Sequence, residues 1–133
     1  MSVSGTTSLD NDVTSISTQG YTGNVTLTND VVLTTTNSQI TFTGTVNSEA
    51  TEANDLTIAV GSSEVQFDSA VRGTVPLGAI ENTGNLDLNS DITSANSINV
   101  TEHSNNAANV TTSGTQTKCK DAVSDTTTVK VRK

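Results

Sequence analysis

The sequence predicts an all-β protein built as a parallel β-helix or β-solenoid of short strands, with a β-sandwich of antiparallel strands as the alternative. Thr, Ser and Asn together supply 56 of the 133 residues, a composition that disfavours helices and suits strands separated by polar turns. Short segments alternate apolar and polar residues, as half-buried strands do. In addition, one spacing of apolar residues recurs four times along the chain.

A chain of 133 residues fits one domain. Only 32% of its residues are hydrophobic and the aromatic residues are Tyr21, Phe42 and Phe67, so the predicted core is thin and made mainly of Val, Ile, Leu and the two phenylalanines. Disorder of the whole chain is the other interpretation of this composition. The low charged fraction of 15% and the regular spacing of β-branched residues favour a fold.

The recurring spacing is apolar, any residue, apolar, three of any residue, apolar. Its copies are Val25-x-Leu27-x3-Val31, Ile40-x-Phe42-x3-Val46, Val65-x-Phe67-x3-Val71 and Leu86-x-Leu88-x3-Ile92. Further alternating segments lie at residues 31–33, 56–60 and 98–100. Turn-forming residues separate the segments at 20–24, 29–30, 36–38, 61–63, 72–73 and 84–85, and Pro76 predicts a bend at the start of a strand.

The copies start at residues 25, 40, 65 and 86, at intervals of 15, 25 and 21, which suit coils of two or three short strands. No Asn-Gly or Asp-Gly hairpin turn is present, which favours the solenoid over the sandwich. Stacked coils then place equivalent residues above one another. The expected columns are Val25, Ile40, Val65 and Leu86, and beside them Leu27, Phe42, Phe67 and Leu88.

The segment from Thr18 to Thr101 resembles one unit of the β-strand-repeat surface exoproteins of bacteria that are akin to filamentous haemagglutinin. The matching elements follow in order as Tyr21-x-Gly23-x-Val25-x-Leu27, Ile40-x-Phe42-x-Gly44-x-Val46, Leu56-x-Ile58, Val65-x-Phe67-x3-Val71-x-Gly73, Pro76-Leu77 and Leu86-x-Leu88-x3-Ile92. The resemblance implies a right-handed parallel β-helix or a related solenoid that serves as the stalk or adhesive surface of a secreted fibre. The insertion at residues 48–52 and Asp68 depart from the family pattern.

These patterns divide the chain into three parts. Residues 1–17 are a capping strand, suggested by Val13-x-x-Ile16, or a flexible segment; residues 18–102 form the solenoid repeat region. Residues 103–133 form a polar and then basic C-terminal segment that does not match the family.

The charge is uneven along the chain. Residues 1–117 hold one basic residue, Arg72, and twelve acidic residues, whereas residues 118–133 hold five basic residues and two acidic ones. The formal net charge of −8 disfavours nucleic acid and anionic membrane surfaces as partners. No apolar run approaches the length of about 18 residues that spans a membrane, so we expect no membrane insertion. We expect an extracellular or cell-surface protein, although residues 1–5 do not resemble a signal peptide.

Candidate residues for chemistry are sparse, and we expect no enzyme, no cofactor and no catalytic residue. His103, the one histidine, lies in a polar stretch, where an exposed loop histidine is the expected state. Cys119 is expected to be a surface residue, with an intermolecular disulfide as the alternative.

Other polar motifs have structural interpretations. Asp10-Asn11-Asp12, Asn29-Asp30 and Asn54-Asp55 are interpreted as turn residues, with weak calcium binding between coils left open. The glycosylation sequons at Asn24, Asn99 and Asn109 fit chance in a chain so rich in Asn and Thr.

Three functions remain open. The favoured one is a structural or adhesive fibre module that binds host or surface glycans or proteins through outward-facing threonines, namely Thr26, Thr28, Thr41, Thr43 and Thr57. The second is ice binding by the Thr-x-Thr rows at residues 26–28 and 41–43. The third is a filament subunit that binds copies of itself by adding a basic strand, Val129, Lys130, Val131 and Arg132, to an exposed sheet edge of the next subunit.

Overall fold

The computed structural model describes the backbone of residues 1–49, 52–71, 77–90, 92–106, 110–112, 116–120 and 129–131. Side chains are described for these residues up to 90 and for residues 97–99. Within the described residues every regular element is a β-strand, and every strand pairing is parallel. The protein is therefore an all-β solenoid of parallel strands, as predicted, and not a β-sandwich.

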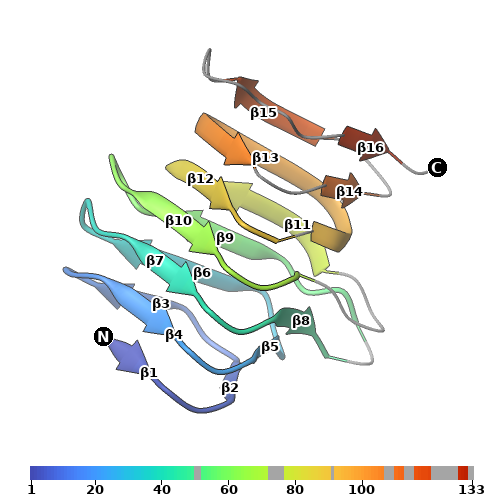
Figure 1. Cartoon of the computed structure of the whole chain (residues 1–133). Coiled ribbons are helices and arrows are strands. Elements are labelled where there is room, and N and C mark those ends of the chain that lie inside the picture. Colours follow the sequence, from blue (N-terminus) through green and yellow to red (C-terminus); the bar gives the residue numbers. More distant parts are fainter. Residues whose placement is uncertain are drawn as a thin grey trace.

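The strands stack into three ladders, here called the first, second and third faces, which the chain visits in turn (Figure 1). The first face contains β1 (Ser2–Val3), β4 (Gln19–Tyr21), β7 (Ile40–Phe42), β10 (Glu64–Phe67), β12 (Asn85–Leu88) and the end of β13 (Ile92–Asn106). The second contains β2 (Thr7–Leu9), β5 (Val25–Leu27) and β8 (Val46–Ser48), and Val46 bridges to Val71. The third contains β3 (Val13–Ser15), β6 (Val31–Thr35), β9 (Leu56–Ala59), β11 (Leu77–Asn82) and the middle of β13.

Further short strands follow β13 along the chain. The first of them, β14 (Val110–Thr112), pairs with β13 and with β16 (Val129–Val131), while β15 (Gln116–Lys120) pairs with β13. The strand β13 crosses the boundary that the sequence placed after residue 102. Strand pairing thus continues into the polar C-terminal segment.

Residues 1–17 supply three strands, β1, β2 and β3, and each pairs with a strand of the next coil. Val13 is half-buried and packs against the core, whereas Ile16 is 85% exposed. The sequence analysis expected residues 1–17 to be either a capping strand or a flexible segment. In the structure they form a coil of the solenoid. Pro76 and its predicted bend lie outside the described residues.

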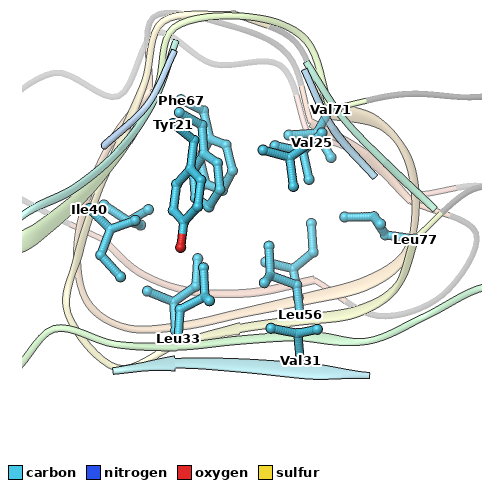
Figure 2. Close-up of a cluster of buried hydrophobic side chains, with 14 of the residues drawn as sticks. Tyr21, Val25, Val31, Leu33, Ile40, Leu56, Phe67, Val71 and Leu77 are labelled. Carbon is cyan, nitrogen blue, oxygen red and sulfur yellow. The ribbon is translucent and has the colours of Figure 1, made fainter. Parts of the chain in front are cut away.

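The apolar core fills the space between the three faces along the axis of the solenoid (Figure 2). Tyr21, Phe42 and Phe67 stack on successive coils, with ring centroids 5.2 Å and 5.0 Å apart and interplanar angles of 11° and 7°. Valine, leucine and isoleucine fill the rest of the cross-section, and Figure 2 shows Val25, Val31, Leu33, Ile40, Leu56, Val71 and Leu77 pointing inward from the three sides. Because the solenoid is narrow, each coil contributes only a few core residues and is buried mainly by its neighbours.

The predicted columns are right for the three copies of the spacing that start at Ile40, Val65 and Leu86, and wrong for the copy that starts at Val25. Ile40, Val65 and Leu86 are in register, and so are Phe42, Phe67 and Leu88. Val25 and Leu27, however, pair with Val46 and Ser48 on the second face. Gln19 and Tyr21 take the places in the first face that the sequence assigned to Val25 and Leu27.

The error arises because the apolar-x-apolar pattern of inward-facing residues occurs on more than one face of the same coil. The copies that start at Ile40 and Val65 each run from the first face to the second, whereas the copy that starts at Val25 runs from the second face to the third. The true equivalent of the other copies is Gln19-x-Tyr21-x3-Val25, in which a buried polar residue replaces the apolar one. Its register places Gly20 beside Thr41 and Thr41 beside Gln66, so consecutive coils differ in length.

Candidate functional site

The five threonines predicted to form a binding surface lie on all three faces. Thr26 is half-buried on the second face, where it is in register with Ser8 and Asn47. Thr28, just beyond β5, donates its hydroxyl to the carbonyl oxygen of Leu9 at 3.2 Å. A flat ligand that contacts Thr26 and Thr28 cannot also contact the predicted threonines that lie on the first and third faces.

The remaining threonines are placed as follows. Thr41 is on the first face, between Gly20 and Gln66 of the adjacent coils, and Thr43 is exposed just beyond β7. Thr57 is on the third face, between Val32 and Glu81. The predicted column of Val25 and Ile40 would have placed Thr26 beside Thr41 on neighbouring strands. This placement is wrong, because the chain turns at Gly23 between β4 and β5 and starts a new face. The regular lattice of hydroxyls needed for ice binding is not formed by these rows.

A connected set of polar side chains covers the outside of the first face. Here it is called the polar ladder and consists of Gln39, Glu64, Gln66, Asp68 and Asn89. The Gln39 amide donates to Glu64 Oε1 at 3.0 Å and to Gln66 Oε1 at 2.8 Å. The amides of Gln66 and Asn89 both donate to Asp68 Oδ1, at 2.6 Å and 3.0 Å. These contacts fix amide and carboxylate groups along successive coils.

Asp87 lies beside the polar ladder, in register with Gln66 on the neighbouring strand. Burial raises the pKa of the Asp87 carboxyl above its ordinary value, and the negative charge of Asp68 raises this pKa further. The first face therefore combines amides, hydroxyls and closely spaced carboxylates. Such a surface can exchange hydrogen bonds with the hydroxyl and amide groups of a polar ligand.

The acidic and amide residues of the turns bond to the backbone of the next coil. Side-chain oxygens of Asp12, Asp30 and Asp55 accept hydrogen bonds from the backbone N–H groups of Val32, Asp55 and Ala79, at 2.8 Å, 2.8 Å and 2.7 Å. Asn24 and Asn37 accept from Thr45 and Ser62 in the same way, at 3.1 Å and 3.0 Å. The turn interpretation of Asp12, Asp30 and Asp55 thus has a physical basis: they hold consecutive coils together.

Calcium remains the alternative for these acids. Asp10 and Asn11 lie in the exposed turn before β3, and Asn29 in the turn after β5 donates its amide to the carbonyl oxygen of Asp10 at 3.4 Å. In the part of the chain that the structure describes, no group of three or more His, Cys, Asp or Glu residues is arranged to hold a metal ion.

The sequence analysis did not identify the polar residues that are buried, and four of them make extensive hydrogen bonds. Asn54 is 3% exposed and donates its amide to the carbonyl oxygen of Leu27 at 2.9 Å and to Ser48 Oγ at 3.1 Å. Ser48 in turn donates to the carbonyl oxygen of Glu52 at 2.6 Å. Asn82, 1% exposed, donates to the carbonyl oxygen of Asn85 at 3.0 Å. All of these contacts satisfy groups that burial would otherwise leave unpaired.

The fourth is Gln19, which is 1% exposed and lies at the N-terminal end of the aromatic stack. Its amide donates to the carbonyl oxygen of Thr34 at 3.0 Å, to Ser15 Oγ at 3.2 Å and to the carbonyl oxygen of Val13 at 3.3 Å. Its Oε1 accepts the Tyr21 hydroxyl at 2.9 Å. Gln19, Tyr21 and Val25 have the spacing of the recurring pattern, which could have identified Gln19 as an inward-facing residue. The pattern was not recognised because Gln19 is polar.

Tyr21 predicts a loss of stability at alkaline pH. Burial raises the pKa of its hydroxyl from 10.0 to about 12, so the folded state favours the protonated form. This contribution is complete below the unfolded pKa of 10.0 and is lost as the pH rises towards about 12. We expect Tyr21→Phe to cost about 1 kcal/mol at neutral pH, because Gln19 Oε1 loses its donor.

The measurement is the free energy of unfolding of both chains from neutral to alkaline pH. The difference between them cancels the titration of lysines that the two chains share. We expect the advantage of the wild type over Tyr21→Phe to shrink above the unfolded pKa. A difference that stays constant across this range would contradict the raised pKa of Tyr21.

The predicted residues near the C-terminus are placed only by their backbones. His103 on β13 is in register with Cys119 on β15. Val129, Lys130 and Val131 form β16, which pairs with β14 of the same chain, and Arg132 lies outside the described residues. Among the sequons, Asn24 and Asn99 are exposed and Asn109 lies outside the described residues.

The described residues contain no helix with the length and apolar character needed to cross a membrane. The chain was also compared with protein families, curated proteins and solved structures. None of the three comparisons finds a match, so the fold stands on the structure itself and the resemblance to haemagglutinin-like exoproteins remains a proposal.

Proposed function

We propose that this protein is a non-enzymatic structural or adhesive module of an extracellular or cell-surface fibre. The observation that carries the proposal is that polar side chains, both buried and at the turns, bond between coils. Gln19 and Asn54 bond from one coil to the backbone of another, as do Asp12, Asp30 and Asp55 at the turns. The polar chemistry of the fold therefore serves to hold the stack together, as expected of a stiff rod.

Adhesion on this proposal uses the first face. The polar ladder already holds its amides and carboxylates in fixed positions, so little side-chain entropy is lost when a ligand binds. Thr41 lies in register with Gln66, and Thr43 is exposed next to β7. A host or surface glycan or protein lying along the solenoid would contact these residues on consecutive coils.

The test is a screen of the purified chain against immobilised glycans and surface proteins, followed by variants. We expect a variant with Gln66→Ala, Asp68→Ala and Asn89→Ala to lose binding by about tenfold or more, because it removes the fixed donors and acceptors of the first face. The matched control carries Thr57→Ala and Glu81→Ala on the third face and should bind as the wild type does. Equal losses in both variants would contradict the assignment of the first face, and the absence of any ligand in the screen would contradict the adhesive role.

A further inference from the structure

The N-terminal coil ends in an open sheet edge on each of the three faces. Within the described residues, β1, β2 and β3 each pair with one strand only, at the start of their ladders (Figure 1). On β2, Thr7 donates its N–H to the carbonyl oxygen of Asn24 at 2.9 Å, and the carbonyl oxygen of Leu9 accepts from Thr28 at 2.9 Å. Alternate residues of a parallel strand bond to opposite sides, so the backbone groups of Ser8 point away from β5.

The strand β1 repeats this arrangement. The carbonyl oxygens of Met1 and Val3 accept from Gly20 and Thr22, both at 2.9 Å, so the backbone groups of Ser2 point away from the solenoid. An unpaired row of donors and acceptors of this kind is a template for another strand.

The apolar side chains next to this edge are covered less completely than those of the inner coils. Leu9 is 6% exposed although its successor in the column, Leu27, is fully buried. Val3 and Val13 are only partly buried where they pack against the core, and Met1 is 47% exposed. A further coil placed on this edge would therefore bury apolar side chains as well as pair backbone groups.

The coils at the other end of the solenoid are close in length to the coil at this edge, as the sequence separation of paired residues shows. Thr7 pairs with Val25, and the pairs Ile92 with Val110 and Ile98 with Gln116 have the same separation along the sequence. The middle coils are longer, since Thr41 pairs with a residue as distant as Gln66. Strands β15 and β16, in turn, each pair on one side only within the described residues.

The two ends also differ in the charges that their sequences carry. Residues 1–18 contain Asp10 and Asp12, both in the exposed turn before β3, and no lysine or arginine, so the Met1 ammonium group is their one positive charge. The edge strands β15 and β16 carry Lys118, Lys120 and Lys130. Opposite charges at the two ends favour contact between unlike ends and oppose contact between two N-terminal ends.

We propose that the N-terminal edge binds the C-terminal edge of a second copy of this chain, so that copies stack head to tail with their strands parallel. The contact continues the three ladders across the boundary between copies. Because the two edges are different surfaces at opposite ends of the solenoid axis, each added copy leaves a free edge at both ends and the contact generates an open series of oligomers. This inference concerns assembly and does not depend on the proposed adhesive role of the first face.

The test uses Ser8→Pro, which removes the N–H that points out of the open edge. Proline is tolerated at such a position because its missing N–H makes no bond within the chain. The matched control is Ser8→Ala, which keeps the N–H. Circular dichroism and the unfolding midpoint of both variants show that the solenoid itself is intact.

Sedimentation velocity and electron microscopy across a wide concentration range then report assembly. We expect the wild type and Ser8→Ala to form a ladder of oligomers and rods that lengthen with concentration and shorten with added salt. Ser8→Pro should associate about tenfold more weakly or not at all. Added in small amounts to the wild type, it should shorten the rods, because its C-terminal edge still binds a growing end while its own N-terminal edge accepts no further copy.

Three results would overturn the proposal. The first is a wild-type chain that stays monomeric at every concentration. The second is a discrete dimer that does not grow, which would indicate contact between like ends. The third is assembly in which folded Ser8→Pro takes part as the wild type does and does not shorten the rods.

Discussion

Replacing Phe42 with alanine is expected to lower the free energy of unfolding by about 3 to 5 kcal/mol, a large part of the stability of a chain of this size. The Phe42 side chain is fully buried and stacks on Tyr21 on one side and Phe67 on the other. The alanine variant loses both ring contacts and leaves a cavity between two coils. Because each coil is buried mainly by its neighbours, the loss affects three consecutive coils. Urea unfolding followed by circular dichroism measures the change.

Two variants control for this experiment. Phe42→Leu keeps most of the buried volume and removes the stacking, so it should cost about 1 to 1.5 kcal/mol. Thr41→Ala alters the neighbouring outward position on the same strand and should change stability by less than about 0.5 kcal/mol. If Phe42→Ala costs no more than Thr41→Ala, the aromatic stack is not a main source of stability.

The sequence predicted the middle of the solenoid well because its apolar positions are filled by apolar residues. Phe42 and Phe67 share a column, and Ile40 and Val65 share the next, as their spacing indicated. Alternation within each strand shows which residues point inward, and the spacing of the copies gives the coil. The alternation and the spacing can both be read from the sequence without knowing in which direction the chain turns between strands.

The first coils were predicted less well because the decisive residue there is polar. Gln19 occupies an inward position and is stabilised by acceptors from three other positions, of which Thr34 is 15 residues away along the chain. A pattern of apolar residues cannot detect a buried amide whose partners come from other coils. For the same reason Asn54 was interpreted as a turn residue, although it is buried and bonds across to Leu27.

The candidate surface was predicted in kind but not in place. Outward-facing threonines do occur, but the side of the solenoid on which each one lies depends on the direction of the turn that precedes it. Thr26 and Thr41 occupy the second position of similar three-residue strands, and they lie on different faces because β5 follows the corner at Gly23. The polar ladder was missed because Gln39 and Gln66 are 27 residues apart and only the stacking brings them together.

The second large effect on stability is expected at the corner between the first and second faces. Gly5, Gly23 and Gly44 occupy this corner in three consecutive coils, and at Gly23 and Gly44 the backbone of the preceding coil lies too close for a side chain. A Cβ atom on Gly44 would lie 2.5 Å from the carbonyl carbon and oxygen of Gly23 and 2.8 Å from the nitrogen of Asn24. The backbone cannot move away freely, because the neighbouring Thr45 donates to Asn24 Oδ1 at 3.1 Å and accepts from the N–H of Val25 at 2.8 Å.

We therefore expect Gly44→Ala to lower the free energy of unfolding by about 2 to 3 kcal/mol, the cost of an overpacked site. Gly5→Ala is the matched control, since Gly5 occupies the same corner at the open end and nothing lies within 4 Å of its added Cβ. Without a clash, alanine should be neutral or stabilise the chain by up to about 1 kcal/mol, because it restricts the unfolded state. Urea unfolding of the two variants at low protein concentration separates these effects. Equal stabilities would mean that the coils are not in close contact at this corner, and a loss at both sites would mean that the edge at Gly5 is covered.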